Sequence, residues 1–295
     1  MKRYRPKQNT NPPVPTPVPS SVKNGMYVNG FTTTLPDNSL RTALKNFIVA
    51  KKFNFLIFYM GSLLDNSTNR GLMRTFLSGL TVDKKGVNVT QSANAINTSD
   101  AGTPAAYNVG CTNASEKFNL FVQEGEFWHE NNYFASFEAY KTNSLLIYNY
   151  CQANNITYDA YVSKCEDVAN VAIPSEIAYW LVQHSDTIHL VNYINVAKFN
   201  KYSGLSDGIK EQIQLYANAA YLAGKTQKIN ILWASEGNYV NGVATNMRDY
   251  FVANPTLLPA YETFKTAYDG WSFTNKSNIS ITGQNNYGYN GIKDL

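Results

Sequence analysis

Apolar runs of strand length alternate with amphipathic stretches of helix length along most of this chain. The run FNFLIFYMG at 53–61 is typical of a strand covered on both faces, and apolar residues recur at helical spacing in the preceding 38–52. The same patterns predict strands at 25–31, 53–61, 86–96, 118–128, 157–164, 187–194, 228–237 and 270–275. They predict helices at 38–52, 69–80, 134–154, 174–184, 206–223 and 246–268.

This alternation favours a parallel sheet covered by helices. About eight strand–helix units in 295 residues favour a closed (β/α)8 barrel over an open doubly wound sheet. No GxGxxG follows the first strand and no GxxxxGK[ST] occurs, so nucleotide-binding α/β folds lose support. We therefore predict one α/β domain, a TIM barrel, over residues 25–295.

Residues 1–24 have a different character. The segment TNPPVPTPVPSS is typical of an extended polyproline-like spacer, which cannot form a core. The basic start lacks an apolar segment, so no signal peptide is predicted, and no apolar stretch reaches the roughly 18 residues of a membrane span. We expect this tail to join the barrel to a protein anchor or an assembly. An extracellular, cell-surface or virion-associated location is favoured.

The composition of the chain excludes or disfavours several classes of ligand for the barrel. The net charge is +4, and much of that excess lies in the first seven residues, which argues against a broad nucleic-acid surface. The three cysteines form no CxxC pair and the histidines are scattered, so we predict no metal site and no cofactor. His189 lies in an apolar run and is expected in the core. The 21 tyrosines and many asparagines suit a carbohydrate ligand, although the bias of an AT-rich genome also explains them.

The stretch FNLFVQEGEFW at 118–128 carries the strongest chemical signal. If the strand spans it, side chains alternate between its faces, and Glu124 and Glu126 point the same way. Two carboxylates on one face of a buried strand are costly without a partner or a role. The structural alternative is a pair of carboxylates at the barrel mouth compensated by Lys164. The functional alternative is catalysis or ligand binding.

Polar and aromatic residues also follow the other predicted strands. In a (β/α)8 barrel these C-terminal strand ends form the active-site mouth. We predict that the substrate contacts there are Tyr59, Gln91, Trp128, Asn192 and Trp271, with Tyr193 and Glu236 among the catalytic residues. Carboxylates, amides and aromatic rings that converge on one mouth are typical of a sugar site.

The predicted fourth strand resembles that of the family 18 glycoside hydrolases, the chitinases and endo-N-acetylglucosaminidases. Their strand carries alternating acids and ends in the acid that protonates the glycosidic oxygen. The resemblance implies that Glu126 is this general acid and that Glu124 is its neighbouring acid. It also implies that Tyr193 holds the N-acetyl group of the substrate and that Trp271 forms the floor under the sugar.

The sequence departs from the family pattern at several positions. Asn119 and Leu120 replace the leading Asp-Gly, and Glu124 stands where the family has Asp. A second resemblance is to retaining glycosidases of the large barrel clan, which implies Glu126 as acid/base and Glu236 as nucleophile. That clan has an Asn where this chain has Gly125.

Two functions therefore remain open from the sequence. The first is a barrel that binds or hydrolyses a polysaccharide containing N-acetylhexosamine. The second is a catalytically inactive barrel, tethered by residues 1–24, that serves as a surface, adhesin-like or virion decoration module. The fold alone cannot choose between them.

Overall fold

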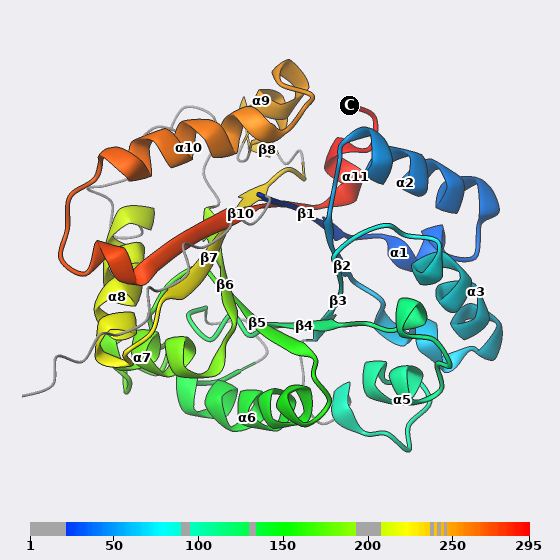
Figure 1. The fold of residues 1–295 in the computed structure, drawn as a ribbon, viewed down its shortest axis with the longest axis horizontal. Coiled ribbons are helices and arrows are strands. Elements are labelled where there is room, and N and C mark those ends of the chain that lie inside the picture. The colour runs from blue at the N-terminus through cyan, green and yellow to red at the C-terminus, as the bar shows by residue number, and fades with distance from the viewer. Residues whose placement is uncertain are drawn as a thin grey trace, which may run out of the picture.

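A computed structural model describes residues 22–89, 95–129, 134–192, 208–236, 239–240, 243–244 and 247–295. Eight parallel strands close a barrel in the order β1-β10-β7-β6-β5-β4-β3-β2, and helices surround it (Figure 1). The predicted (β/α)8 barrel is confirmed. Gln91, Tyr193 and residues 1–21 of the predicted tail lie outside the described residues.

The barrel strands are short and follow the apolar runs of the sequence. They are β1 (Lys23–Val28), β2 (Phe55–Phe58), β3 (Lys84–Val89), β4 (Leu120–Glu124), β5 (Thr157–Val162), β6 (Thr187–Asn192), β7 (Gln227–Ala234) and β10 (Ile279–Tyr287). The parallel pair β1–β10 closes the barrel, with Gly25 opposite Asn285. A small antiparallel pair, β8 (Tyr239–Val240) and β9 (Val243–Ala244), lies apart from the barrel sheet.

The outer layer is helical. Its helices are α1 (Phe31–Thr34), α2 (Asn38–Ala50), α3 (Ser67–Ser78), α5 (Pro104–Val109), α6 (Phe137–Ala153), α7 (Pro174–His184), α8 (Ile209–Leu222), α9 (Arg248–Ala253), α10 (Leu258–Gly270) and α11 (Tyr289–Ile292). Short 3₁₀ turns are η1 (Gly61–Asp65), η2 (Ala114–Glu116) and η4 (Lys276–Asn278). Local chemistry sets several starts: the Asp37 carboxylate caps α2, and Pro174 occupies the first turn of α7.

The last barrel strand differs from the prediction. The sequence pattern placed it at 270–275, but the structure forms β10 at Ile279–Tyr287, and 270–275 connects α10 to it. The reason is that β10 carries Gly283, Gln284, Asn285 and Asn286, all buried, where an apolar run was expected. Polar interior positions of a barrel strand hide the apolar signal on which strand prediction depends. The helical stretch predicted at 246–268, which Pro255 and Pro259 interrupt in the sequence, is α9 and α10 in the structure.

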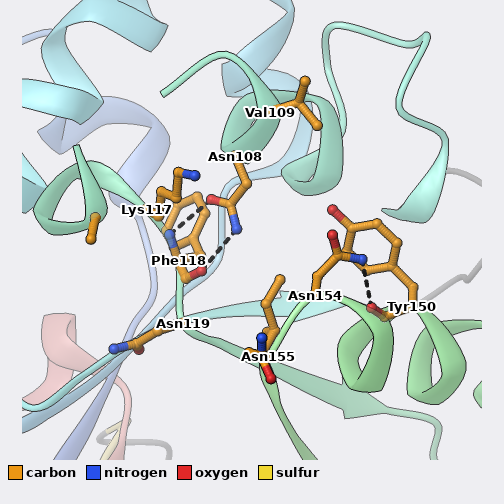
Figure 2. A pocket seen from close by; sticks show the side chains of 10 residues that line it. Asn108, Val109, Lys117, Phe118, Asn119, Tyr150, Asn154 and Asn155 are labelled. Atoms are coloured by element: carbon orange, nitrogen blue, oxygen red, sulfur yellow. Dashed lines mark hydrogen bonds between the residues drawn. The ribbon is translucent and has the colours of Figure 1, made fainter. Parts of the chain in front are cut away.

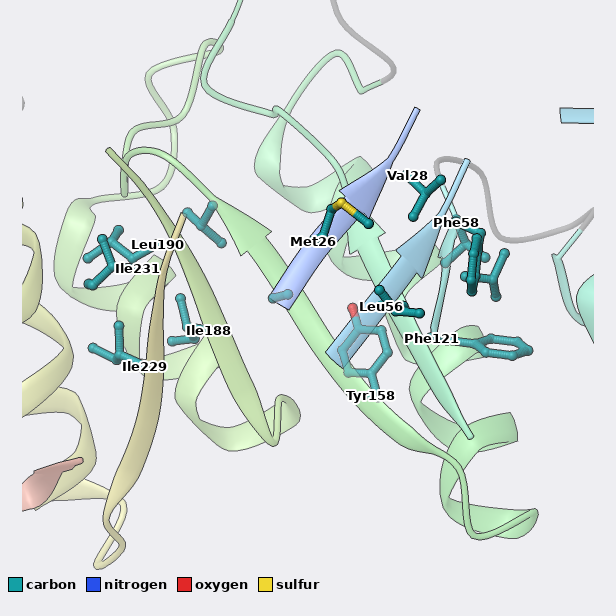
Figure 3. Close-up of a cluster of buried hydrophobic side chains, with 14 of the residues drawn as sticks. Met26, Val28, Leu56, Phe58, Phe121, Tyr158, Ile188, Leu190, Ile229 and Ile231 are labelled. Atoms are coloured by element: carbon teal, nitrogen blue, oxygen red, sulfur yellow. The ribbon is translucent and has the colours of Figure 1, made fainter. Parts of the chain in front are cut away.

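Two apolar clusters lie on the two faces of the barrel sheet. The outward-facing side chains pack against the helices (Figure 3) and include Met26, Val28, Leu56, Phe58, Phe121, Ile188, Leu190, Ile229 and Ile231. The inward-facing side chains fill the barrel and are Tyr27, Phe55, Ile57, Leu120, Val122, Tyr161, Val191 and Leu232. Successive residues of each strand thus alternate between the two clusters, as the pleat requires.

A buried polar group crosses the barrel interior below the mouth. The Nε2 atom of His189 lies 3.0 Å from Oδ2 of Asp159, and its Nδ1 lies 2.8 Å from the hydroxyl oxygen of Tyr27. The backbone N–H of Thr187 donates to Oδ1 of Asp159 at 3.0 Å. If Nε2 carries the proton, it donates to Asp159, while Nδ1 accepts from the hydroxyl of Tyr27 and from Nδ2 of Asn285, 3.2 Å away. His189 is fully buried, as the sequence predicted.

The closure between β1 and β10 predicts the effect of one glycine substitution. A Cβ at Gly283 would overlap the carbonyl oxygen of Lys23 in the neighbouring strand, so Gly283→Ala should destabilise the barrel by roughly 1–3 kcal/mol. Gly71 in α3 has open space around it, so Gly71→Ala should stabilise by about 0.5–1 kcal/mol. Urea unfolding of both variants checks this. Equal midpoints for the two would contradict the close approach at Gly283.

Candidate functional site

Glu124 is the last residue of β4 and lies at the C-terminal end of the barrel, where its side chain is only 8% exposed. Its Oε2 atom accepts two hydrogen bonds, from the hydroxyl of Tyr59 at 2.6 Å and from Nδ2 of Asn88 at 2.7 Å. Tyr59 directly follows β2 and Asn88 belongs to β3. Three neighbouring strands therefore hold one carboxyl group, and the structure brings together the predicted residues Glu124 and Tyr59.

The environment of Glu124 favours its protonated form. Burial raises the pKa of this carboxyl, the hydrogen bonds from Tyr59 and Asn88 act in the opposite direction, and the charges of Glu126 and Glu236 raise it again. The net result is a pKa above the usual range of glutamate. Partial burial also raises the pKa of Glu236, which is exposed just after β7. Glu124, Glu126 and Glu236 thus interact electrostatically at one end of the barrel.

Tyrosine rings surround this carboxyl group. The ring of Tyr27 lies 6.0 Å from that of Tyr59, 6.1 Å from that of Tyr161 and 5.8 Å from that of Tyr287. Burial and the charge of Glu124 raise the pKa of Tyr287 to about 12 and that of Tyr59 well above its ordinary value. These hydroxyls consequently stay protonated and can act as hydrogen-bond donors at neutral pH.

The sequence did not single out Tyr27, Tyr161 and Tyr287. Each occupies an inward position of a strand, two of them in β1 and β5, where period-2 alternation was available as a signal. Tyr287 lies in β10, which the sequence pattern did not reveal. Asn88 was also missed, because the predicted third strand ran to 96 whereas β3 ends at Val89.

Glu126 does not share the strand face of Glu124. β4 ends at Glu124, and Glu126 has a φ of 38°, in the left-handed region that favours glycine. A Cβ at Gly125 would overlap the ring of Tyr140, and Phe127 packs 4.8 Å from the same ring. This packing turns the chain out of the strand, so the predicted alignment of the two glutamates is wrong. Glu126 lies partly exposed beyond the strand end.

The structure places two other predicted substrate contacts elsewhere. Trp271 caps α10, before β10 begins, and its ring lies 5.7 Å from that of Tyr268, with the Lys210 ammonium over it. The residue therefore precedes a strand instead of following one, and its predicted position at the mouth is wrong. Asn192 ends β6 on the face opposite to Val191, which faces the barrel interior.

Trp128 follows the end of β4 and lies beside the mouth, and its predicted role as a substrate contact stays a prediction. Its ring stacks on that of Tyr161, with an interplanar angle of 18° and a centroid distance of 6.4 Å. The side chain is partly exposed and lines an open groove of about 460 Å³. One part of the Trp128 side chain thus packs on Tyr161, and another part lines the groove at the surface.

A second hollow, of about 220 Å³, lies at the opposite end of the barrel (Figure 2). It is lined by Phe118 and Asn119, which precede β4, and by Ile156, which precedes β5. Asn108 binds both backbone groups of Phe118, accepting from N–H at 2.9 Å and donating to the carbonyl at 2.8 Å. This asparagine therefore holds the start of β4 in place.

Within the described part of the chain, no group of three or more His, Cys, Asp or Glu side chains is arranged to hold a metal ion. None of the described helices is long and apolar enough to cross a membrane.

No protein-family model matches this chain. No curated protein sequence matches it either. Among solved structures, the YdjI aldolase from Escherichia coli K12 is similar, with a TM-score of 0.41 and 9% identity over 90% of this chain and 75% of that one. The spore cortex-lytic enzyme SleL of Bacillus megaterium QM B1551 is similar, with a TM-score of 0.46 and 10% identity over 93% of this chain and 72% of that one. These distant similarities concern the barrel alone, and membership of glycoside hydrolase family 18 is not confirmed.

The environment of Glu124 predicts a specific pH dependence of stability. Because its pKa is raised in the folded state, the folded protein holds this proton more tightly than the unfolded chain does. Glu124 therefore lowers stability as pH rises from the ordinary glutamate value through the folded pKa. Tyr59→Phe removes a donor to Oε2, raises the pKa of Glu124 further, and should steepen this loss, whereas Glu124→Gln should abolish it.

Urea unfolding between about pH 4 and pH 8 measures this effect. Tyr221→Phe, on the exposed side of α8, is the matched control and should follow the wild-type curve. A Tyr59→Phe curve parallel to that of the wild type would contradict the assigned hydrogen bond.

Proposed function

We propose that the mouth of this barrel binds a glycan and that Glu124 transfers the proton in hydrolysis of its glycosidic bond. The observation that carries the proposal is the Glu124 carboxyl itself, which is buried, has a raised pKa and is fixed by hydrogen bonds from Tyr59 and Asn88. Both donors bind Oε2, and Oε1 has no hydrogen-bond partner among the residues that the structure describes. A general acid at neutral pH needs such a raised pKa and one oxygen that a substrate can reach.

The two donors also assist the proton transfer. When Glu124 gives up its proton, the group becomes a carboxylate, and hydrogen bonds from Tyr59 and Asn88 to the charged form are stronger than those to the neutral acid. Burial thus favours the protonated form before the reaction, and the donors stabilise the anion that the reaction produces. Together they bring the acid and its conjugate base closer in energy at the mouth.

Glycoside hydrolysis uses a second carboxylate, as base or nucleophile. Glu236 and Glu126 are the candidates, since the charges of both act on Glu124. The rings of Tyr59 and Tyr287, 5.8 Å apart and partly exposed beside Glu124, offer surface for the apolar faces of pyranose rings. We propose a polysaccharide that contains N-acetylhexosamine as the substrate, on the basis of the family 18 resemblance in strand β4. The predicted roles of Tyr193 and Gln91 remain predictions.

The catalytically inactive barrel remains a second candidate, and one observation favours it. The backbone at Glu126 leaves the strand, so the residue at the position of the family 18 acid does not face inward beside Glu124. In this case the mouth binds a glycan without cleaving it. The barrel would then act as a surface, adhesin-like or virion decoration module, held by residues 1–24.

Substitution of Glu124 by glutamine tests the proposal. Glu124→Gln keeps the shape of the side chain but cannot donate a proton, so kcat on a cleaved oligosaccharide should fall by about 10²–10⁴ while binding persists. Chitooligosaccharides and a panel of other neutral glycans are the substrates, with product release and calorimetry as the measurements. Glu262→Gln on the exposed face of α10 is the control and should behave as wild type.

The possible results separate the two candidates. Wild-type turnover that survives in Glu124→Gln would assign the proton transfer to another residue. Binding without turnover by the wild type would establish the inactive module. Absence of binding across the panel would refute the glycan proposal.

A further inference from the structure

A groove opens beside the mouth, at the same C-terminal end of the barrel. Trp128 forms one side, and the segment that follows β5 forms the other, with Glu166, Val168, Asn170 and Ile173 among its lining residues. Its volume of about 460 Å³ is in the range of small-molecule binding sites, roughly 300–1,000 Å³. Neither the Glu124 site nor its tyrosines use this groove.

The wall of the groove is held in place by a buried carboxylate. Asp167 accepts hydrogen bonds from the backbone N–H groups of Phe137, Ala169, Val171 and Ala172, at 3.0, 3.1, 3.3 and 3.0 Å. Burial opposes ionisation of Asp167, but these backbone donors prevail and hold the pKa of its carboxyl below the usual range. The groove is thus preformed, which lowers the entropic cost of binding a ligand.

The groove is fixed to the end of β4 as well. The backbone N–H of Val168 donates to the carbonyl of Phe127 at 3.1 Å. Phe127 directly precedes Trp128, so this bond sets the groove wall relative to the tryptophan ring. The distance between the two sides of the groove therefore depends on the same turn that carries Glu126.

Trp128 connects the groove to the Glu124 site. It lines the groove, packs against the inner apolar cluster and stacks on Tyr161. Tyr161 in turn contacts Tyr27, whose ring neighbours Tyr59, the donor to Glu124. Aromatic rings thus run without interruption from the groove to the carboxyl group. Tyr161 and Tyr27 are buried, so these rings join the two places through the protein interior, and a ligand that reaches both places passes over the partly exposed ring of Trp128.

The polar groups of the groove indicate the charge of its ligand. Glu166 and Asn170 are exposed and offer acceptors and donors to hydroxyl groups. The lining contains no Lys, Arg or His within the described residues, and its two ionisable members are acidic. The Glu166 carboxylate lies 3.8 Å from the ammonium of Lys164, so these two charges offset each other and the groove suits a neutral ligand. Val168 and Ile173 add apolar surface for the faces of a neutral sugar.

We propose that this groove is a further sugar subsite, so that a neutral glycan bound at Glu124 continues over Trp128 and along the 166–174 segment. The inference rests on the proposed function, and it restricts the ligand to glycans that carry no charge. The ligand is a neutral oligosaccharide or polysaccharide that spans the mouth and the groove, and a monosaccharide fills the mouth alone.

The test compares oligosaccharides of increasing length. Glu124→Gln protein, which does not turn over its ligand, is titrated by calorimetry with N-acetylglucosamine and its oligomers up to the hexasaccharide, and with a second neutral series. Affinity should rise with length until the groove is filled. Trp128→Ala should weaken binding of the longest ligand about tenfold and leave the shortest unchanged, and Trp128→Phe should restore most of the loss.

Two controls make the result specific. Trp271→Ala removes a tryptophan at the other end of the barrel and should leave the whole length series unchanged. Thermal unfolding of each variant shows that the barrel is intact, and a Trp128→Ala protein that fails to fold is replaced by Ile173→Asp, which places a charge in the groove.

Each outcome decides one of the two proposals. Affinity independent of length, or equal losses for short and long ligands in the Trp128 variants, would overturn the groove subsite and leave the proposed function standing. Failure of every saccharide to bind even the wild type would overturn the proposed function itself, and the groove inference with it.

Discussion

A carboxyl group buried at the end of a barrel strand is stabilised either by its proton or by donors to its charge, and the surroundings of Glu124 act in both directions. Its burial and the nearby charges of Glu126 and Glu236 favour the neutral acid, while Tyr59 and Asn88 favour the anion. Because these effects oppose each other, the free energies of the protonated and the charged Glu124 differ less than burial alone would make them differ. The rest of the mouth follows from this constraint, because the strands that provide the two donors must bring them to one oxygen atom.

The interior below Glu124 holds the tyrosines in position. Asp159 binds His189, His189 binds the hydroxyl of Tyr27, and the ring of Tyr27 lies against those of Tyr59 and Tyr287. The hydroxyl of Tyr27 therefore points toward the buried histidine and is not available at the mouth. Tyr59 keeps its own hydroxyl for Glu124. A fully buried polar group thus orients an aromatic layer that in turn supports the donor to the carboxyl.

The barrel was predictable from the sequence because most of its strands contain apolar residues and alternate with amphipathic helices. β10 was not, since its interior positions carry Gly283, Asn285 and other polar residues that pack inside the barrel. Because the last strand was predicted at 270–275, Trp271 was expected at the mouth. In the structure Trp271 caps α10. Interior amides of this kind depend on contacts across the barrel, which a local pattern cannot reveal.

The site was predictable in part, for a similar reason. Glu124, Tyr59 and Trp128 follow from the rule that barrel chemistry lies at the C-terminal strand ends. The alignment of Glu126 with Glu124 failed because period-2 alternation applies only while the strand continues. Gly125 lets the ring of Tyr140 approach the backbone, and that contact from α6 ends the strand two residues before Glu126, to which the alternation would have to run.

The strained turn at Glu126 bears on which carboxylate assists Glu124. A non-glycine residue in the left-handed region costs of order 1–3 kcal/mol and persists only where surrounding structure determines it. Here Gly125 and the buried Phe127 both pack against the ring of Tyr140, so the packing determines the turn.

Glycine or asparagine would adopt the φ of Glu126 at lower cost, yet this position carries a carboxylate whose charge raises the pKa of Glu124. Glu236 reaches Glu124 electrostatically from an exposed position after β7, without such a constraint. In the proposed hydrolysis, Glu126 would therefore act from a backbone fixed beyond the strand end, and Glu236 from an exposed position after β7.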